Sequence, residues 1–473
     1  MAGNKNRLAS KTGASFFKFW GCLLSQQNLF LLLILSLSIQ VSAQFEKDYT
    51  PLKYSYSGSK QTEKNFQKKL SVKYLTNDKG IIHDYNRFLY SLHLMYASQS
   101  KEKAFIIEPF VKRYLQSIID TVAARNKLNQ KFEVVCTRFL EVNAYNMGDN
   151  KLYVNIGLLR RLENESQLAF LLCHELAHQL LSHVQENFIQ LRTKAKDKTI
   201  KKELKDINKA KYNKLDRTVQ IAKRENYSFG KYSRVKERSA DSLAAILLTE
   251  TEYDAREGIS LMRILEKSDT DLTRINYPEL FKGDSVSILP EWMAPRKELL
   301  DFGRKSIIEF DKDSMRTHPD IPNRIRMIEE QLKSMKSVLN GKQLFVQDKQ
   351  LFDSIRTMAM LEEVEVFVKF KRYGAMVYYG LAALQKLPDN VYLHKNVAIA
   401  LNHLQKAVKT HTSQDFVPLE SEDLPEAYNQ FLRIMDRTTY TDFRKLVYQY
   451  LQNNKNRIIQ IPEVKTIYEN FYK

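Results

Sequence analysis

Two histidines and a glutamate stand close together in the run His174-Glu175-Leu176-Ala177-His178. Apolar residues surround them, and the pattern predicts a buried helix from Glu163 to Val184. On a helix, positions 174 and 178 project from the same face, so both imidazoles can reach one metal ion. A zinc ion there would activate a water molecule, and Glu175 is placed to act as its general base. The spacing predicts metal-dependent hydrolysis; two core histidines beside a stray glutamate are the alternative.

A catalytic zinc needs a third protein ligand and one open position. The metzincin pattern would require glycine at position 181 and histidine at position 184, but Leu181 and Val184 stand there. His183 is nearby, yet it lies roughly 140° around the predicted helix from His178, because each residue turns a helix by about 100°. We therefore expect His183 to have a packing or surface role and look for the third ligand elsewhere.

A carboxylate from a later helix is the other option, and the run Glu237-Arg238-Ser239-Ala240-Asp241 supplies one. Glu237 and Asp241 lie one helical turn apart on the same face. We expect Glu237 to be the third zinc ligand and Asp241 to orient a ligand histidine through a hydrogen bond. Taken alone, such a pair of acids is typical of an exposed helix face, and only the upstream histidines give it this meaning.

The elements around these residues follow from the spacing of apolar side chains. Helical spacing runs from about Asp84 to Lys127, and strands are predicted at Lys131–Leu140 and Lys151–Ile156. The turn before the second strand contains Gly148-Asp149-Asn150. A helix is predicted from about Val235 to Thr249, and helical segments continue past Pro319. The expected fold class is α+β, mostly helical, with one small sheet.

The chain changes character from about Asp348. The segment KRYGAMVYYGLAALQKLPDNVYLHKNVAIALNHLQ resembles one tetratricopeptide-type helix pair, with small residues where the helices approach. Only one such unit is evident, and flanking helices would have to serve as its caps. We expect a helical segment over 44–125, a zinc metallopeptidase domain over 126–335 and a helical repeat-like domain over 336–473.

Residues 1–43 have the composition of a secretory signal. Four basic residues precede the apolar run Leu29–Ile39, and Val41-Ser42-Ala43 offers a cleavage site. We expect cleavage near Ala43; an uncleaved N-terminal anchor is the alternative. No later segment approaches about 18 uninterrupted apolar residues, so no membrane span is expected in the body of the chain.

The chain is basic, with a formal net charge of +19. In a secreted protein this charge makes nucleic acid an unexpected partner and favours anionic membrane surfaces or acidic proteins. The segment Arg192–Arg224 carries much of it and predicts a long basic helix or helical hairpin. That segment is either a solvated face or a peripheral contact with a membrane or a client protein.

These motifs resemble the gluzincin metallopeptidase family that includes the CAAX prenyl protease, HtpX, Oma and BepA. The resemblance runs from about Phe132 to Ile328, and it places His174, Glu175 and His178 on the family's zinc helix. It matches Glu237, Ala240 and Asp241 to the third-ligand helix. Asn143-Ala144-Tyr145 and the following Leu152-Tyr153-Val154 resemble the family's Asn-Ala-Phe element and the substrate-pairing strand after it, which implies that substrate binds at Asn143 and Ala144. Asn146–Asn150 departs from the family's Pro-Gly-Gly turn.

Thr317-His318-Pro319 followed by Arg324 resembles a His-Pro…Arg motif near the family's active site. The resemblance implies that His318 and Arg324 are catalytic, because a cation or a His N–H near zinc would stabilise negative charge on the carbonyl oxygen. Alternatively, His318 could occupy the open zinc position and keep the enzyme latent. From the sequence alone, the alternative stays open that His318 is a surface or helix-capping residue and that Arg324 is a surface charge.

A signal, a peptidase and a helical C-terminus together resemble the BepA-like periplasmic branch of the family. The resemblance implies one Zn²⁺ per chain, a cell-envelope location and a role in protein quality control. Its substrates would be outer-membrane or misfolded proteins, and the C-terminal helices would bind a protein partner. The alternative is a helical-repeat chaperone or binding protein whose peptidase domain is latent.

Overall fold

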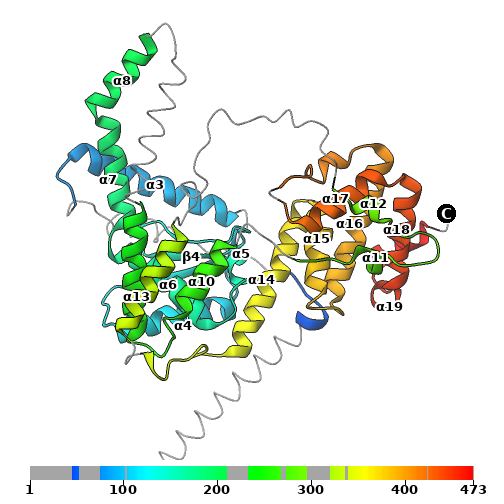
Figure 1. The fold of residues 1–473 in the computed structure, drawn as a ribbon, viewed down its shortest axis with the longest axis horizontal. Helices are drawn as coiled ribbons and strands as arrows, with labels where there is room; N and C mark the ends of the chain where they lie inside the picture. Colours follow the sequence, from blue (N-terminus) through cyan, green and yellow to red (C-terminus); the bar gives the residue numbers. More distant parts are fainter. Residues whose placement is uncertain are drawn as a thin grey trace, which may run out of the picture.

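A computed structural model describes the protein at residues 45–52, 75–101, 104–209, 233–267, 273–295, 320–335, 339–422 and 424–471 (Figure 1). The expected signal over 1–43, the second half of the basic segment and His318 lie outside these ranges. The described residues are mostly helical and include one small sheet, which confirms the predicted fold class. Among them, no helix is both long and apolar enough to cross a membrane.

The sheet has four strands in the order β1-β2-β4-β3. β2 (Glu133–Thr137) and β4 (Lys151–Asn155) are parallel neighbours, and both fall inside predicted strands. The antiparallel β1 (Phe105–Ile106) and β3 (Ala144–Asn146) form the two edges. Because β4 has a neighbour on each side, its residues 152–154 cannot pair with a substrate, contrary to the expectation for that stretch. The edge strand β3 is the one placed to do so.

The helix that carries the histidines, α6 (Glu165–Leu180), is buried along almost its whole length. It contacts α4 (Pro109–Arg125), strands β3 and β4, and α10 (Glu257–Glu266). The prediction of one continuous helix to Val184 is wrong. α6 ends at Leu180, Ser182 adopts a left-handed backbone with φ of 57°, and α7 (His183–Lys196) begins directly after it.

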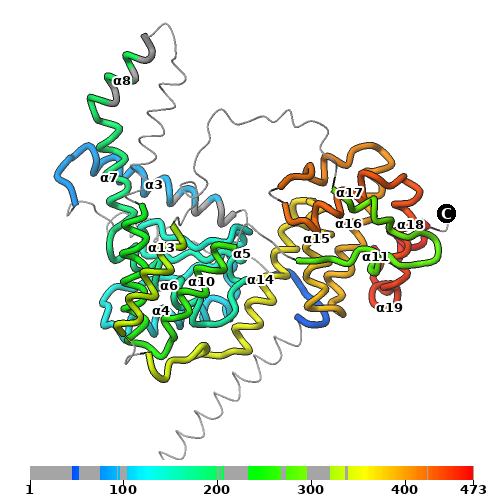
Figure 2. The backbone as a smooth tube through the Cα atoms, viewed as in Figure 1, coloured from blue at the N-terminus to red at the C-terminus, as the bar shows by residue number. Residues whose placement is uncertain are grey.

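The basic segment leads away from the body of the molecule. α3 (Lys79–Lys101) packs on α7 through a cluster of apolar residues, and the rings of Tyr85 and Phe188 lie 5.2 Å apart. After a break at Asp197, α8 (Lys198–Lys209) projects outward from this pair (Figures 1 and 2). The basic segment, which the sequence predicts as a long helix or a helical hairpin, forms two helices in its described part.

Most of the remaining helices form a second body. Its helices are α15 (Tyr373–Leu384), α16 (Val391–Thr410), η3 (Ser413–Asp415), α17 (Glu426–Arg437), α18 (Tyr440–Asn453), α19 (Lys455–Ile458) and α20 (Pro462–Glu469). α15 and α16 form the predicted helix pair. The short helices α11 (Tyr277–Leu280) and α12 (Pro290–Met293) also lie here, although they precede α13 (Ile321–Ser334) in the chain (Figure 1).

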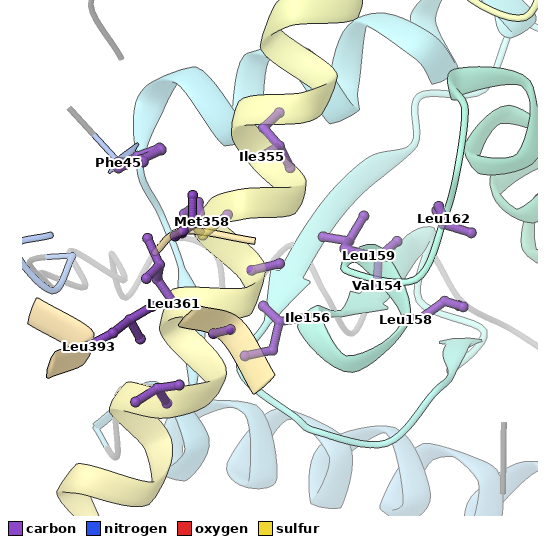
Figure 3. Packing of buried hydrophobic residues seen from close by; sticks show 14 of the residues in the cluster. Phe45, Val154, Ile156, Leu158, Leu159, Leu162, Ile355, Met358, Leu361 and Leu393 are labelled. Carbon is purple, nitrogen blue, oxygen red and sulfur yellow. The ribbon is translucent and has the colours of Figure 1, made fainter. Parts of the chain in front are cut away.

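The helix α14 (Lys349–Lys369) joins the two bodies. Figure 3 shows Ile355, Met358 and Leu361 of α14 beside Ile156 and Leu159, which belong to the short helix α5 (Ile156–Leu159) after β4. α5 itself approaches the preceding loop so closely that a Cβ on Gly157 would lie 2.0 Å from the carbonyl oxygen of Leu140. A glycine is therefore required at position 157 for this packing.

The segment 45–52 contributes to the same junction, although its sequence is largely polar. The carbonyl of Phe45 accepts a hydrogen bond of 2.7 Å from Asn390 Nδ2, and the Tyr49 hydroxyl donates to the buried carboxylate of Glu362. Arg138, just after β2, forms a buried ion pair with the same carboxylate. Three distant parts of the chain thus meet at Glu362.

Candidate metal centre

Two helices bring three potential metal ligands together. His174 and His178 come from α6, and Glu237 comes from the helix over 233–249. The Nε2 atoms of the histidines lie 3.1 Å apart. Glu237 Oε2 lies 3.4 Å from His174 Nε2, and Glu237 Oε1 lies 3.4 Å from His178 Nε2. One ligand atom from each of the three side chains lies within 4.8 Å of the other two, so the three could hold one metal ion.

The spacing of these atoms is compatible with a tetrahedral zinc ion. Zinc binds histidine nitrogen and carboxylate oxygen at about 2.0–2.2 Å, and tetrahedral angles then separate the ligand atoms by about 3.3 Å. The observed separations of 3.1 and 3.4 Å are close to that value. Two imidazoles and one carboxylate are also the donor set of many catalytic zinc sites. The residues present therefore fit the metal that the sequence predicts.

Asp241 and Arg324 form a buried charged pair behind His174. His174 Nδ1 lies 2.9 Å from Asp241 Oδ1, which leaves Nε2 directed at the site. Arg324 on α13 donates to both oxygens of Asp241, from Nε at 2.6 Å and from Nη2 at 2.8 Å. Arg324 Nη1 also lies 3.0 Å from Glu237 Oε2. The guanidinium thus holds one metal ligand and the residue that orients another.

These contacts shift the pKa values of His174 and Asp241. Burial alone would lower the pKa of His174, but the hydrogen bond and charge of Asp241, together with Glu237, outweigh burial and raise it to about 10. Burial would raise the pKa of Asp241, but the charge of Arg324 and the bonds from Arg324 and His174 lower it below its ordinary value. Without metal, Asp241 is therefore an anion and His174 carries a second proton that a metal must displace.

His183 contacts the candidate metal ligand His178, which the sequence did not predict. Its Nδ1 lies 2.9 Å from His178 Nδ1, and its Nε2 lies 3.3 Å from Ser239 Oγ. The angular argument against His183 assumed a helix continuing past Leu180, and the left-handed Ser182 instead turns His183 back towards His178. Burial, with the charges of neighbouring groups, lowers the pKa of His183 to about 3. Ser182, a polar residue directly after Leu180 and Leu181, was the one available hint of the turn.

Lys236 fixes the helix over 233–249 against α7. Its buried ammonium donates to the carbonyl of His183 at 3.0 Å and to Asn187 Oδ1 at 2.8 Å, and it lies 3.0 Å from Glu186 Oε2. Because Lys236 precedes Glu237 directly, these contacts set the position of the third ligand. They also hold Ser239 against His183.

Glu175 lies at a small cavity beside the metal ligands. The cavity measures about 10 Å³, room for about one water molecule, and Glu175 itself is 2% exposed. Leu261, Met262 and Leu265 of α10 form one wall. α10 is held close to α6 because residue 258 is glycine: a Cβ there would lie 2.3 Å from a ring atom of Phe170. Glu175, the predicted general base, therefore lies next to His174 and is covered by α10.

Asn143 and Ala144, the expected substrate-binding residues, line the same cavity as His174 and Glu175. Ala144 begins the edge strand β3, which lies along α6. The following turn, which departs from the family's Pro-Gly-Gly, uses two positive φ angles, 78° at Gly148 and 62° at Asn150. An edge strand beside the base is where an extended peptide could add a further strand.

The structure therefore brings together eight residues at one site: Asn143, Ala144, His174, Glu175, His178, Glu237, Asp241 and Arg324. All eight were predicted from the sequence. Arg324 is 1% exposed, which excludes a surface role, and its donors face Asp241 and Glu237. His318 lies outside the described residues.

Comparison with known families agrees with this geometry. Residues 109–332 match the model of Peptidase family M48, and the match contains every element of the site. No curated protein matches the chain. The family is one of metal-dependent peptidases, and His174, His178 and Glu237 lie close enough together to hold one metal ion. Over residues 109–332, this chain is similar to the peptidases of family M48.

Proposed function

We propose that this protein is a zinc-dependent endopeptidase of the cell envelope that acts in protein quality control. The observation that carries the proposal is the cluster of His174, His178 and Glu237 beside the buried carboxylate of Glu175. A bound zinc would lower the pKa of a water molecule and polarise the substrate carbonyl. The Nε2 atoms of the two histidines face each other at 3.1 Å, as two ligands of one ion would; without metal, the extra proton of His174 would make the same contact a hydrogen bond between the rings.

The side chains of this chain then have separate tasks in hydrolysis. The substrate backbone pairs with β3 at Asn143 and Ala144, which holds the scissile carbonyl near Glu175. Glu175 accepts a proton from the attacking water and transfers it to the departing amide nitrogen. Arg324 keeps Glu237 and Asp241 in place, and its cationic charge also favours negative charge on the carbonyl oxygen.

A latent form is the second candidate, and the closed site favours it. The cavity at Glu175 is about 10 Å³, far too small for a peptide, so α10 must move before substrate binds. In that case the protein would act as a helical-repeat chaperone or binding protein until its peptidase is released. Zinc content measured together with casein degradation separates the two candidates. Zinc with degradation supports the active enzyme, and zinc without degradation supports the latent one.

Location and partners complete the proposal. We place the mature protein outside the cytoplasm, with outer-membrane or misfolded proteins as substrates and no role for nucleic acid. The basic segment over 192–224 would contact a membrane or an acidic client. The C-terminal helices would bind a protein partner, and their cavity of about 670 Å³ beside α16 and α17 supports such a role. Cell fractionation, and proteins that co-purify with a Glu175→Gln variant, test these points.

A further inference from the structure

His183 contacts the metal centre without belonging to its ligands. The side chain is 6% exposed and lies at the start of α7, with one ring nitrogen on each of two partners. Nδ1 faces His178 Nδ1 at 2.9 Å, and Nε2 faces Ser239 Oγ at 3.3 Å. Ser239 Oγ in turn donates to the carbonyl of Lys236 at 2.9 Å. These contacts make a continuous chain from a metal ligand to the backbone of the third-ligand helix.

Only one set of proton positions satisfies this chain once His178 binds metal through Nε2. The Nδ1 of His178 must then carry its proton and donate it, so Nδ1 of His183 must accept. The proton of His183 therefore sits on Nε2 and points at Ser239. Ser239 Oγ accepts this hydrogen bond, and its own hydroxyl donates one to the carbonyl of Lys236. Each donor in the chain has an acceptor, and the last acceptor is a fixed backbone group.

The surroundings keep His183 neutral, as an acceptor must be. A second proton on His183 would place one N–H against another at His178. The ammonium of Lys236, bound to the backbone carbonyl of His183 itself, opposes a further positive charge. Glu186 is the nearby anion on α7, and Lys236 already neutralises it at 3.0 Å.

We propose that His183 is a positioning residue of the metal centre: it fixes the tautomer and ring orientation of His178. Asp241 does the same for His174, but Asp241 is anionic and His183 is neutral. Each ligand histidine thus has its own partner: Asp241, on the helix over 233–249, contacts His174, and His183, on α7, contacts His178. The inference rests on the proposed zinc site, since without a metal His178 has no fixed tautomer to hold.

Chelator-competition titration of zinc tests the proposal on the full-length protein. His183→Phe keeps a ring of similar size but removes both nitrogens, and we expect zinc affinity to fall about 10–100-fold. His183→Asn should restore most of the affinity, because an amide oxygen can occupy the place of Nδ1. His183→Gln, which places its oxygen near Nε2 instead, should not. The Asn and Gln variants keep the test decisive if the Phe variant does not fold.

A matched control separates positioning from general stability. His394 is also 6% exposed and also uses both ring nitrogens, on Tyr450 Oη at 3.0 Å and the Pro388 carbonyl at 2.8 Å. His394→Phe should lower the unfolding temperature and leave zinc affinity unchanged. If wild-type protein binds zinc and His183→Phe binds it equally well, or if the Asn and Gln variants are equivalent, the proposal is wrong. If wild-type protein binds no zinc, the proposed function itself fails.

Discussion

At the residue scale, the candidate ligands are held by groups behind them. Asp241 faces His174, His183 faces His178, and Arg324 contacts Glu237. Such contacts raise metal affinity because the ligand atoms need little rearrangement when the ion binds. The partners differ in charge, and this difference predicts different consequences when each one is removed.

Asp241→Ala should both weaken zinc binding and destabilise the metal-free protein. The change removes the partner of His174, which costs about 10–100-fold in zinc affinity. It also removes the bidentate partner of Arg324, which is 1% exposed and keeps only its contact with Glu237, so we expect a cost at the lower end of about 3–5 kcal/mol. Urea unfolding of metal-free protein and chelator competition measure the two effects. An unchanged zinc affinity would show that Asp241 does not contribute to metal binding.

Zinc binding should weaken as the pH falls. In the metal-free protein the pKa of His174 is raised from 6.5 to about 10, so below that pH zinc must displace a proton from the ring. The logarithm of the zinc association constant should fall by about one for each unit of pH. The same proton stabilises the metal-free fold below about pH 6.5, and this contribution is lost as the pH rises through about 10. A zinc affinity independent of pH between about 6.5 and 8.5 would contradict the shift.

At the element scale, α10 covers Glu175, the proposed general base. Leu261, Met262 and Leu265 close the cavity at Glu175, and Gly258 lets the helix lie close to Phe170. Lids of this kind commonly set turnover rates, because the lid must open for substrate to enter. The helix is short, and the residues that follow it, 268–272, lie outside the described ranges.

Leu265→Ala should therefore accelerate hydrolysis of a short peptide severalfold, because it trims the cover while leaving the metal ligands untouched. Ile259→Ala is the matched control. Ile259 is also partly buried on α10 but does not line the cavity, so its truncation should cost similar stability without the gain in rate. Equal rates for both variants and the wild type would show that α10 does not limit access.

The sequence predicted those parts of the site that depend on local spacing. His174, Glu175 and His178 share one helix, as do Glu237 and Asp241, and helical periodicity places each set on one face. His183 was missed because its position depends on a single left-handed residue, Ser182, which interrupts the helix. The two-residue strand β1 was missed for a similar reason. The apolar residues before Pro109 continued the helical pattern, yet the helix begins at that proline.

At the scale of the whole molecule, packing between distant segments decides the arrangement. Short-range periodicity carries no information on such pairings. Nothing in the sequence around Tyr277 indicates that its hydroxyl binds the carbonyl of Ala427, 2.7 Å away among the C-terminal helices. Likewise, Phe45 and Tyr49 lie in a stretch of polar composition but are buried at the junction with α14. The helix pair α15–α16 was predictable because its two helices are neighbours in the chain.

Glu362→Ala should destabilise the protein strongly, because Glu362 joins α14 to Arg138 and to the 45–52 segment. The change removes a buried ion pair and the acceptor of the Tyr49 hydroxyl, and we expect a cost of about 3–5 kcal/mol. Glu365→Ala on the same helix is the control, since Glu365 accepts one bond, from Tyr392, and should cost about 1 kcal/mol. Urea-unfolding midpoints compare the two, and equal shifts would argue against a junction at Glu362.

The central claim is that His174, His178 and Glu237 hold a zinc ion whose chemistry depends on Glu175. The most direct measurement is zinc content and peptide hydrolysis, compared between purified wild-type protein and Glu175→Gln. We predict one zinc per chain in both proteins, with hydrolysis in the wild type alone, because the substitution removes the base and keeps the ligands. A folded wild-type protein that takes up no zinc, or a Glu175→Gln variant that hydrolyses peptide at the wild-type rate, would contradict the account.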